Sequence, residues 1–205
     1  MASRTYRSPQ RTEAAARTRA RLVDAATALL AAADSGPVSL DAVAKAAGVT
    51  RLTVYNQFGS RRALLEAVFD DLAQRGGLGQ LAEAMADGNP RAGLDRLITI
   101  FCAFWDFRRA AMARLEAEAI ADPELADSLA ARNARRRQAL AVLVGRIAGR
   151  SGARAARDLV DVLFALTGHA FFAALTADGR STAAACALIQ SLASDAVARV
   201  APPQR

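Results

Sequence analysis

Apolar residues recur at helical spacing along nearly the whole chain, and this periodicity limits the fold more than any other feature of the sequence. In segment 11–33, for example, one helical face gathers Leu22, Val23, Ala26, Leu29 and Leu30. No segment alternates apolar and polar residues in the way that a half-buried β-strand does. The sequence therefore predicts an all-α protein.

Capping residues and helix breakers divide this pattern into separate helices. Ser39 and Thr50 are expected to cap two short helices, the first of which closes at Gly48. Further along, Asn89-Pro90 and Asp122-Pro123 each pair a capping side chain with a proline at the first helical position. The helices predicted in this way lie near 11–33, 39–48, 50–58, 61–75, 78–86, 90–107, 109–121, 123–149, 153–177 and 181–200.

A glycine-rich stretch at 76–79 is the expected joint between two domains, residues 1–75 and residues 76–205. The same glycines are only a weak signal for a phosphate-binding loop, because no predicted strand precedes them and no Gly-Lys-Ser follows. Positive charge is concentrated in the amino-terminal domain. The chain has a net charge of +7, and residues 1–62 carry ten basic against four acidic side chains. This imbalance favours a polyanionic partner such as nucleic acid.

The two cysteines, the polar amino terminus and the longest uncharged run indicate the cellular compartment of the protein. Cys102 and Cys186 lie far apart in apolar stretches, which predicts buried thiols in a reducing cytoplasm rather than a disulfide framework or a metal site. A disulfide bond between them stays open as an alternative. The first 20 residues are polar and rich in arginine, unlike a secretory signal. The uncharged run between Asp161 and Asp178 is too short to span a bilayer convincingly. We expect a cytoplasmic protein with no membrane partner.

Two short helices joined at Gly48-Val49, with a longer helix on either side, match the helix-turn-helix arrangement that places its second helix in the major groove of DNA. At 100° per residue, a buried Val54 directs Leu52 and Asn56 outward, with Arg51, Thr53 and Tyr55 between. Side chains of these polar types form hydrogen bonds to phosphates and base edges. A merely solvated helix would more often carry Glu and Lys there.

The run from Arg21 to Leu65 resembles the amino-terminal domain of the TetR family of transcriptional regulators without a gap. The Ala47-Gly48-Val49 turn and the Tyr55-x-x-Phe58 pair carry this resemblance. Two positions depart from the family pattern, with Arg61 in place of the usual lysine and Asp34 in place of the usual glycine. The resemblance implies a helix-turn-helix DNA-binding domain followed by a helical ligand-binding and dimerisation domain.

Carried over position by position, the resemblance implies that Arg51, Leu52 and Tyr55 face base edges. It also implies phosphate contacts from Ser39, Thr50, Thr53, Asn56, Gln57 and Arg61. Ser39 and Thr50 are also expected to act as helix caps, and the two roles are compatible because a helix amino terminus is already an anion site. A minor-groove arm formed by Arg4, Arg7 and Arg11 is a further hypothesis, and a solvated terminus is its alternative.

Helix 90–107 carries a broad apolar stripe that is rich in aromatic residues. In the TetR family the equivalent region lines a ligand cavity, and the aromatic stripe predicts a small apolar or aromatic effector. The candidate effector residues are Phe101, Phe104, Trp105, Met112 and Phe172. Simple packing of the core is the alternative for each of them.

Segments 159–175 and 183–200 are apolar almost all round, which predicts burial on two sides. The resemblance implies that these helices form a C2 four-helix bundle in a homodimer. Such a dimer would hold two recognition helices about one turn apart, roughly 34 to 36 Å, on a near-palindromic double-stranded DNA operator.

The predicted function is therefore a ligand-responsive, sequence-specific DNA-binding regulator, most simply a repressor that its effector releases from the operator. One alternative is a helical carrier or enzyme that uses the aromatic helix and His169. Another is an architectural DNA-binding protein without a ligand. No nucleophile, acidic pair or metal-spaced set accompanies His169 in the sequence, so we predict no catalytic residue, metal site or cofactor.

Overall fold

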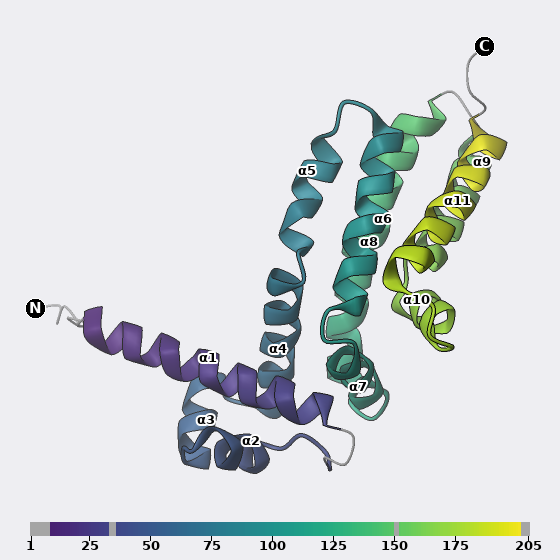
Figure 1. Cartoon of the computed structure of the whole chain (residues 1–205). Helices are drawn as coiled ribbons and strands as arrows, with labels where there is room; N and C mark the ends of the chain where they lie inside the picture. The colour runs from purple at the N-terminus through teal and green to yellow at the C-terminus, as the bar shows by residue number, and fades with distance from the viewer. Residues whose placement is uncertain (1–8, 33–35, 150–151, 202–205) are drawn as a thin grey trace, which may run out of the picture. The chain divides into compact units, whose positions relative to one another are not determined.

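A computed structural model describes residues 9–32, 36–149 and 152–201, and every regular element in these ranges is a helix (Figure 1). This confirms the all-α class. The elements are α1 (Pro9–Ala31), α2 (Leu40–Ala47), α3 (Arg51–Phe58), α4 (Arg61–Arg75), a 3₁₀ turn η1 (Leu78–Gln80), α5 (Leu81–Ala86), α6 (Pro90–Asp106), α7 (Arg109–Ile120), α8 (Pro123–Ala148), α9 (Ala153–Leu166), α10 (His169–Thr176) and α11 (Thr182–Val200).

The helices belong to two compact units, and the chain passes from one to the other after Asp71, Arg109 and Ala126. The first unit holds α1, α2, α3, most of α4 and nearly all of α7. The second holds the end of α4, η1, α5, α6, most of α8, and α9 to α11. Helix α7 therefore groups with the amino-terminal helices, although α5 and α6 precede it in the sequence.

Local capping builds the α2–α3 pair of the first unit. Ser39 has an extended backbone, and its hydroxyl oxygen accepts a hydrogen bond from the Ala42 amide at 3.1 Å. At the other end of α2, Gly48 adopts the left-handed conformation with φ 65°. The Val49 amide then reaches back to the carbonyl of Ala44 at 3.0 Å, which closes the helix. Both predicted ends of this helix are confirmed.

A core of fully buried aliphatic side chains holds the first unit together. Helix α1 packs against α2, and α2 packs against α3. The buried side chains come from each of these helices and from α4, and include Leu22, Val43, Val54, Leu64 and Leu65, all 0 % exposed. Burial of this kind stabilises the fold by roughly 1.5 to 3 kcal/mol per large aliphatic side chain. Helix α3 is thus anchored on one side through Val54.

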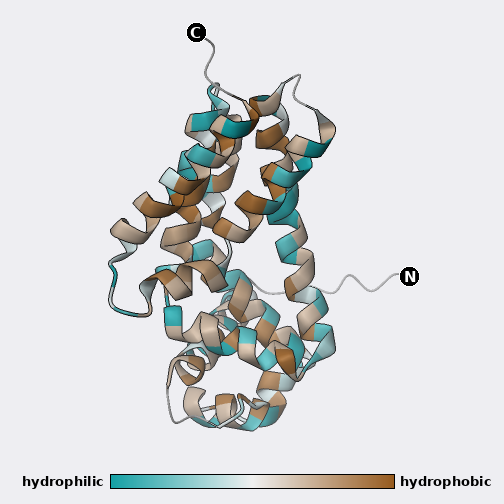
Figure 2. Cartoon of the chain, turned by 90° about the vertical axis from the view of Figure 1, so that its right-hand side faces the viewer, coloured by the Kyte–Doolittle hydropathy of each residue, from teal (hydrophilic) through white to brown (hydrophobic). Residues whose placement is uncertain are grey.

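Helix α6 occupies the middle of the second unit and packs against α5, α10 and α11. Its contact with α5 is close, because a Cβ atom at Gly93 would lie only 2.5 Å from the carbonyl oxygen of Ala84. Only glycine allows the two helices this approach. Hydrophobic bands, brown in Figure 2, alternate with hydrophilic ones along the helices of both units.

The prediction of a single helix over 153–177 is wrong, because this segment contains two helices. The structure breaks it at Thr167-Gly168 into α9 and α10, which are bent by 49°. Side chains from other helices bind the polar groups at the break. Arg136 donates to the carbonyl of Phe164 at 2.7 Å and to the Thr167 hydroxyl at 2.8 Å. The indole N–H of Trp105 donates to the carbonyl of Thr167 at 3.0 Å. The break is a tertiary feature that helical periodicity does not encode.

Helix α11 is long and apolar enough to cross a membrane by length and composition, as are α9 and α10 taken together. In the structure, however, one stripe of α11 is buried within the second unit, through Ala185, Ile189, Ala193 and Val197. Its opposite face carries small side chains and the charged Asp195. This pattern is that of a helix that packs on a protein core.

Candidate functional site

The short helix α3 presents one face to the core and the other to solvent. The Thr50 hydroxyl accepts a hydrogen bond from the Thr53 amide at 3.2 Å, which fixes the start of the helix. Gly59, at φ 72°, ends it, and its amide bonds to the carbonyl of Tyr55. Because Val54 is fully buried between these two ends, the rotation of α3 about its axis is set. The outward face is therefore as the periodicity predicted.

That outward face exposes two large side chains that would ordinarily be covered. Leu52 is 65 % exposed and Tyr55 is 55 % exposed. Arg51 and Asn56 are also exposed, while Thr53 and Gln57 are half-buried. Exposed apolar and aromatic groups beside hydrogen-bonding groups are typical of a surface that binds a partner.

Two arginines of α1 hold the ends of α2 and α3. Arg21 donates to the carbonyl of Ala47 at 2.9 Å, and Arg19 donates to the carbonyl of Gln57 at 2.9 Å. The guanidinium of Arg19 also lies 4.3 Å from the centre of the Phe58 ring. A cation is favourable at a helix carboxyl terminus, where the last carbonyls lack partners. Sequence reasoning counted both arginines only as general positive charge and missed this positioning role.

Arg51 has an acidic neighbour on α2. Its Nε lies 3.6 Å from an oxygen of Asp41, and both side chains are more than two-thirds exposed. An exposed pair of this kind contributes only about 0 to 1 kcal/mol. The guanidinium can therefore leave Asp41 for another acceptor at small cost.

Arg61, at the start of α4, lies in a cluster of charges shared with α7. Its guanidinium pairs with Glu118 and, at 3.5 Å, with Asp122, and its Nε donates to the carbonyl of Val38 at 2.6 Å. Arg114 binds the second oxygen of Glu118 at 3.3 Å. The Glu118 side chain is only 11 % exposed, so it depends on these cations for its charge. The sequence predicted the position of Arg61 on α4 but gave no sign of its acidic partners.

Residues 22–68 match the family described as bacterial regulatory proteins, tetR family. The match covers the buried face of α1, the α2–α3 pair and most of α4. Residues 22–68 are therefore a TetR-family domain. The resemblance noted in the sequence is thereby confirmed.

Several solved structures resemble this chain over most of its length, well beyond the TetR-family domain. A TetR-like transcriptional regulator from Rhodococcus sp. RHA1 is 22 % identical, with a TM-score of 0.69 over 88 % of this chain and 96 % of that one. A transcriptional regulator from Rhodococcus sp. Rha1 is 20 % identical, with a TM-score of 0.71 over 91 % and 99 %. A protein of Mesorhizobium loti MAFF303099 assigned to the TetR family is 19 % identical, with a TM-score of 0.65 over 90 % and 97 %. At these identities the likeness establishes the fold. No curated protein matches the sequence.

The TetR-family domain brings together the residues that the sequence singled out for DNA. Thr50 caps α3, and the helix itself carries the largest group of predicted contacts. Ser39 caps α2, and Arg61 starts α4. Arg4, Arg7 and Asp34 lie outside the described residues, and of Arg11 the structure describes the backbone alone. The minor-groove arm therefore stays a hypothesis.

The residues predicted to meet an effector are all buried, with Phe101, Phe104, Trp105 and Phe172 in the second unit. The ring of Trp105 lies 4.6 Å from that of Phe104 and 5.3 Å from that of His169, measured between centres. Met112, in contrast, is part of α7 and belongs to the first unit. The structure thus forms an aromatic cluster around Trp105 but does not include Met112 in the same unit.

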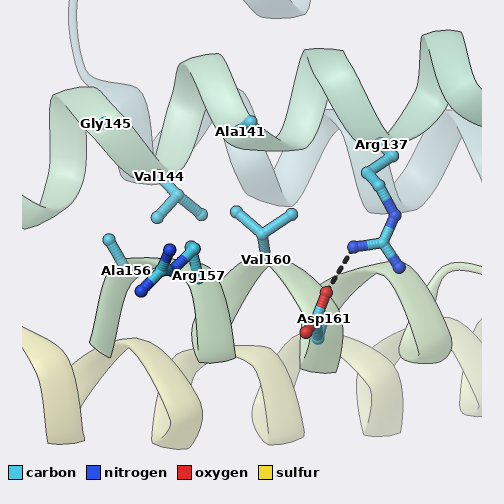
Figure 3. A pocket seen from close by; sticks show the side chains of 8 residues that line it. All are labelled: Arg137, Ala141, Val144, Gly145, Ala156, Arg157, Val160 and Asp161. Carbon is cyan, nitrogen blue, oxygen red and sulfur yellow. Dashed lines mark hydrogen bonds and ion pairs between the residues drawn. The ribbon is translucent and has the colours of Figure 1, made fainter. Parts of the chain in front are cut away.

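A ligand-sized groove lies elsewhere in the second unit, between α8 and α9 (Figure 3). Its volume is about 380 Å³, and its floor is formed by small and aliphatic side chains such as Val144 and Val160. The Arg137–Asp161 ion pair closes one end, and Arg157 lines the groove toward the other. Periodicity gave no sign of this groove, because it depends on the separation of two helices. Within the described ranges, no three His, Cys, Asp or Glu side chains gather as a metal site.

Proposed function

We propose that the chain is a sequence-specific DNA-binding transcriptional regulator that inserts α3 into the major groove. The observation that carries the proposal is the exposure of Arg51, Leu52 and Tyr55 on a helix whose rotation is fixed by Val54, within a TetR-family domain. An arginine, an aliphatic group and a phenol side by side suit guanine, the thymine methyl group and a base edge or phosphate.

Phosphate contacts are assigned to the groups that surround this face. The hydroxyls of Ser39 and Thr50 lie at two helix amino termini, where backbone amides and the helix dipole also favour an anion. Thr53, Asn56 and Gln57 would add hydrogen bonds, and Arg61 would add charge if it leaves its acidic partners. Such contacts fix the position of the protein on the DNA duplex, but they do not distinguish one base pair from another.

Replacement of Arg51 tests the assignment of the base-reading face. Arg51→Ala is expected to weaken binding to the operator by about 1 to 3 kcal/mol and to relax preference at one base pair. Arg154→Ala is the matched control, because it removes the same charge from an exposed position of the second unit. Titrations on operator and random DNA at several salt concentrations measure both. Equal losses on the two DNAs after Arg51→Ala would contradict base reading.

A homodimer is proposed as the binding species, joined through α9, α10 and α11. The outward face of α11 consists mainly of small residues, among them Ala184, Ala187, Ser191 and Ala198, which allow another helix to approach closely. On α9, Val162 is 44 % exposed. A second copy of the chain would cover these groups and present two recognition helices to a near-palindromic operator.

An apolar or aromatic effector is proposed to bind at the Trp105 cluster and to release the operator, in the cytoplasm where the DNA lies. Entry requires the buried rings to separate, and by linkage the DNA-free form must bind the effector more tightly. Trp105 is the chain's single tryptophan, so a compound that binds there should change the protein's tryptophan emission.

The groove between α8 and α9 supplies the control for this effector site. Compounds are first selected by release of operator DNA and then tested on Trp105→Phe and Val160→Arg. The proposal predicts weaker binding to Trp105→Phe and unchanged binding to Val160→Arg. If only Val160→Arg lost binding, the effector site would instead be the groove between α8 and α9.

A further inference from the structure

The fold brings the chain's two cysteines together. Cys102 lies on α6 and Cys186 on α11, and these two helices pack against each other within the second unit. The Cys186 sulfur lies 3.8 Å from the hydroxyl oxygen of Thr99, which is one turn before Cys102 on α6, and Cys186 is near enough to raise the pKa of the Cys102 thiol. Two cysteines from segments far apart in the sequence thus lie at one helix–helix contact and form a thiol pair that the function proposed above does not use.

Polar side chains around the pair fix the register of α6 against α11. Thr99, one turn before Cys102, accepts hydrogen bonds from the Cys186 thiol at 3.8 Å and from the Gln190 amide at 3.1 Å. Gln190 also donates to the carbonyl of Asp95 at 3.2 Å. Because these bonds hold α11 in place along α6, the approach of the two sulfur atoms is part of the packed structure.

The two thiols differ in their access to solvent. Cys102 is 3 % exposed, whereas Cys186 is only half-buried. Burial raises the pKa of the Cys102 thiol, and the neighbouring Cys186 raises it further. A small oxidant therefore meets Cys186 first.

We propose that Cys102 and Cys186 are an oxidation site at which a hydroperoxide converts the thiol pair into an intramolecular disulfide bond. The Cys186 thiolate attacks the peroxide, a sulfur–oxygen bond forms, the oxygen–oxygen bond breaks, and an alcohol or water leaves. The Cys102 sulfur then attacks the Cys186 sulfenic acid, a sulfur–sulfur bond forms, and a second water departs with the Cys102 proton. Two thiols lose two electrons, and one hydroperoxide gains them.

The disulfide bond would lock α6 to α11, and α6 also carries the aromatic cluster around Trp105. Its effect on operator release rests on the proposed function. Formation of the bond itself does not, so the test uses chemistry alone and its failure is distinct from a failure to bind DNA.

The full-length protein is treated with hydrogen peroxide without denaturant, and its remaining thiols are alkylated after unfolding. We expect both cysteines to escape alkylation and a tryptic map to show segment 97–108 linked to segment 181–199. Dithiothreitol should restore both free thiols. The link should also raise Tm, because it closes a long loop in the unfolded chain.

Two variants show the order of events. In Cys102→Ala, Cys186 has no partner and should proceed to sulfinic acid, whereas in Cys186→Ala, Cys102 should stay reduced under the same treatment. The proposal is overturned if the wild-type protein keeps both thiols, if its Cys186 proceeds to sulfinic acid, or if the disulfide bond joins two chains. The wild-type map decides the matter even where a variant fails to fold.

Discussion

At the residue scale, Asp41 pairs with Arg51, the residue of α3 that we propose to read a base. The pair is exposed and its Nε to oxygen distance is 3.6 Å, so the attraction to be broken is small. The carboxylate also lies beside the face that would approach phosphates, and it repels them. Under the proposed function, Asp41 would therefore weaken DNA binding in both ways.

Asp41→Asn should accordingly strengthen operator binding, by up to about fivefold from the ion pair alone. Fluorescence anisotropy at two salt concentrations measures the change, and the gain should shrink as salt rises. Asp158→Asn, an equally exposed change in the second unit, is the control. Weaker binding by Asp41→Asn would mean instead that Asp41 holds Arg51 in its productive orientation.

At this scale, the sequence could predict the features that depend only on neighbouring residues in the chain. Ser39 and Thr50 as caps, and Gly48 with its left-handed backbone, follow from a few neighbouring residues and are confirmed. Arg19 and Arg21 could not be assigned, because the carbonyls that they bind belong to other helices. The proximity of Cys102 to Cys186 could not be predicted either, because the two residues lie on different helices.

At the element scale, the cluster around Arg61 ties the start of α4 to the end of α7 inside the first unit. Helix α4 follows α3 directly in the chain, so its anchoring bears on how α3 is held. Helical periodicity predicted both helices, yet their pairing depends on a chain reversal between them that periodicity does not show.

Arg61→Ala should lower the free energy of unfolding by about 2 kcal/mol, because it leaves the nearly buried Glu118 with less compensation. Chemical denaturation measures this loss. Arg62→Ala is the matched control, since Arg62 pairs with the exposed Glu124, and it should cost less than about 1 kcal/mol.

The same variant tests the phosphate assignment of Arg61. If Arg61 also contacts a phosphate, the salt dependence of DNA binding should fall by about one unit for both operator and random DNA. An unchanged salt slope with reduced stability would restrict Arg61 to its structural role in the α4–α7 cluster.

The break between α9 and α10 illustrates the other limit at this scale. The uncharged, apolar run over 162–177 contains no proline, and Gly168 alone does not require a helix to end. Arg136 and Trp105 stabilise the break by binding carbonyls and a hydroxyl that a continuous helix would use internally. Both partners come from distant helices, so the break follows from packing.

At the scale of the whole molecule, the proposed function requires two copies of the chain. Ala187→Arg places a charged side chain on the outward face of α11, where an isolated chain tolerates it because Ala187 is exposed. We expect a monomer in sedimentation at micromolar concentration and a large loss of operator affinity. Ala131→Arg, on an exposed position of α8, should stay dimeric. A dimeric Ala187→Arg protein would place the interface elsewhere.

Selection of bound sequences from random DNA shows whether the protein binds double-stranded DNA in a sequence-specific way. We expect enrichment of a near-palindromic sequence whose half-sites are centred about 10 base pairs apart, and we expect Arg51→Ala to lose the enrichment at the half-site positions. Enrichment of no sequence, with binding that depends on salt alone, would contradict sequence-specific binding.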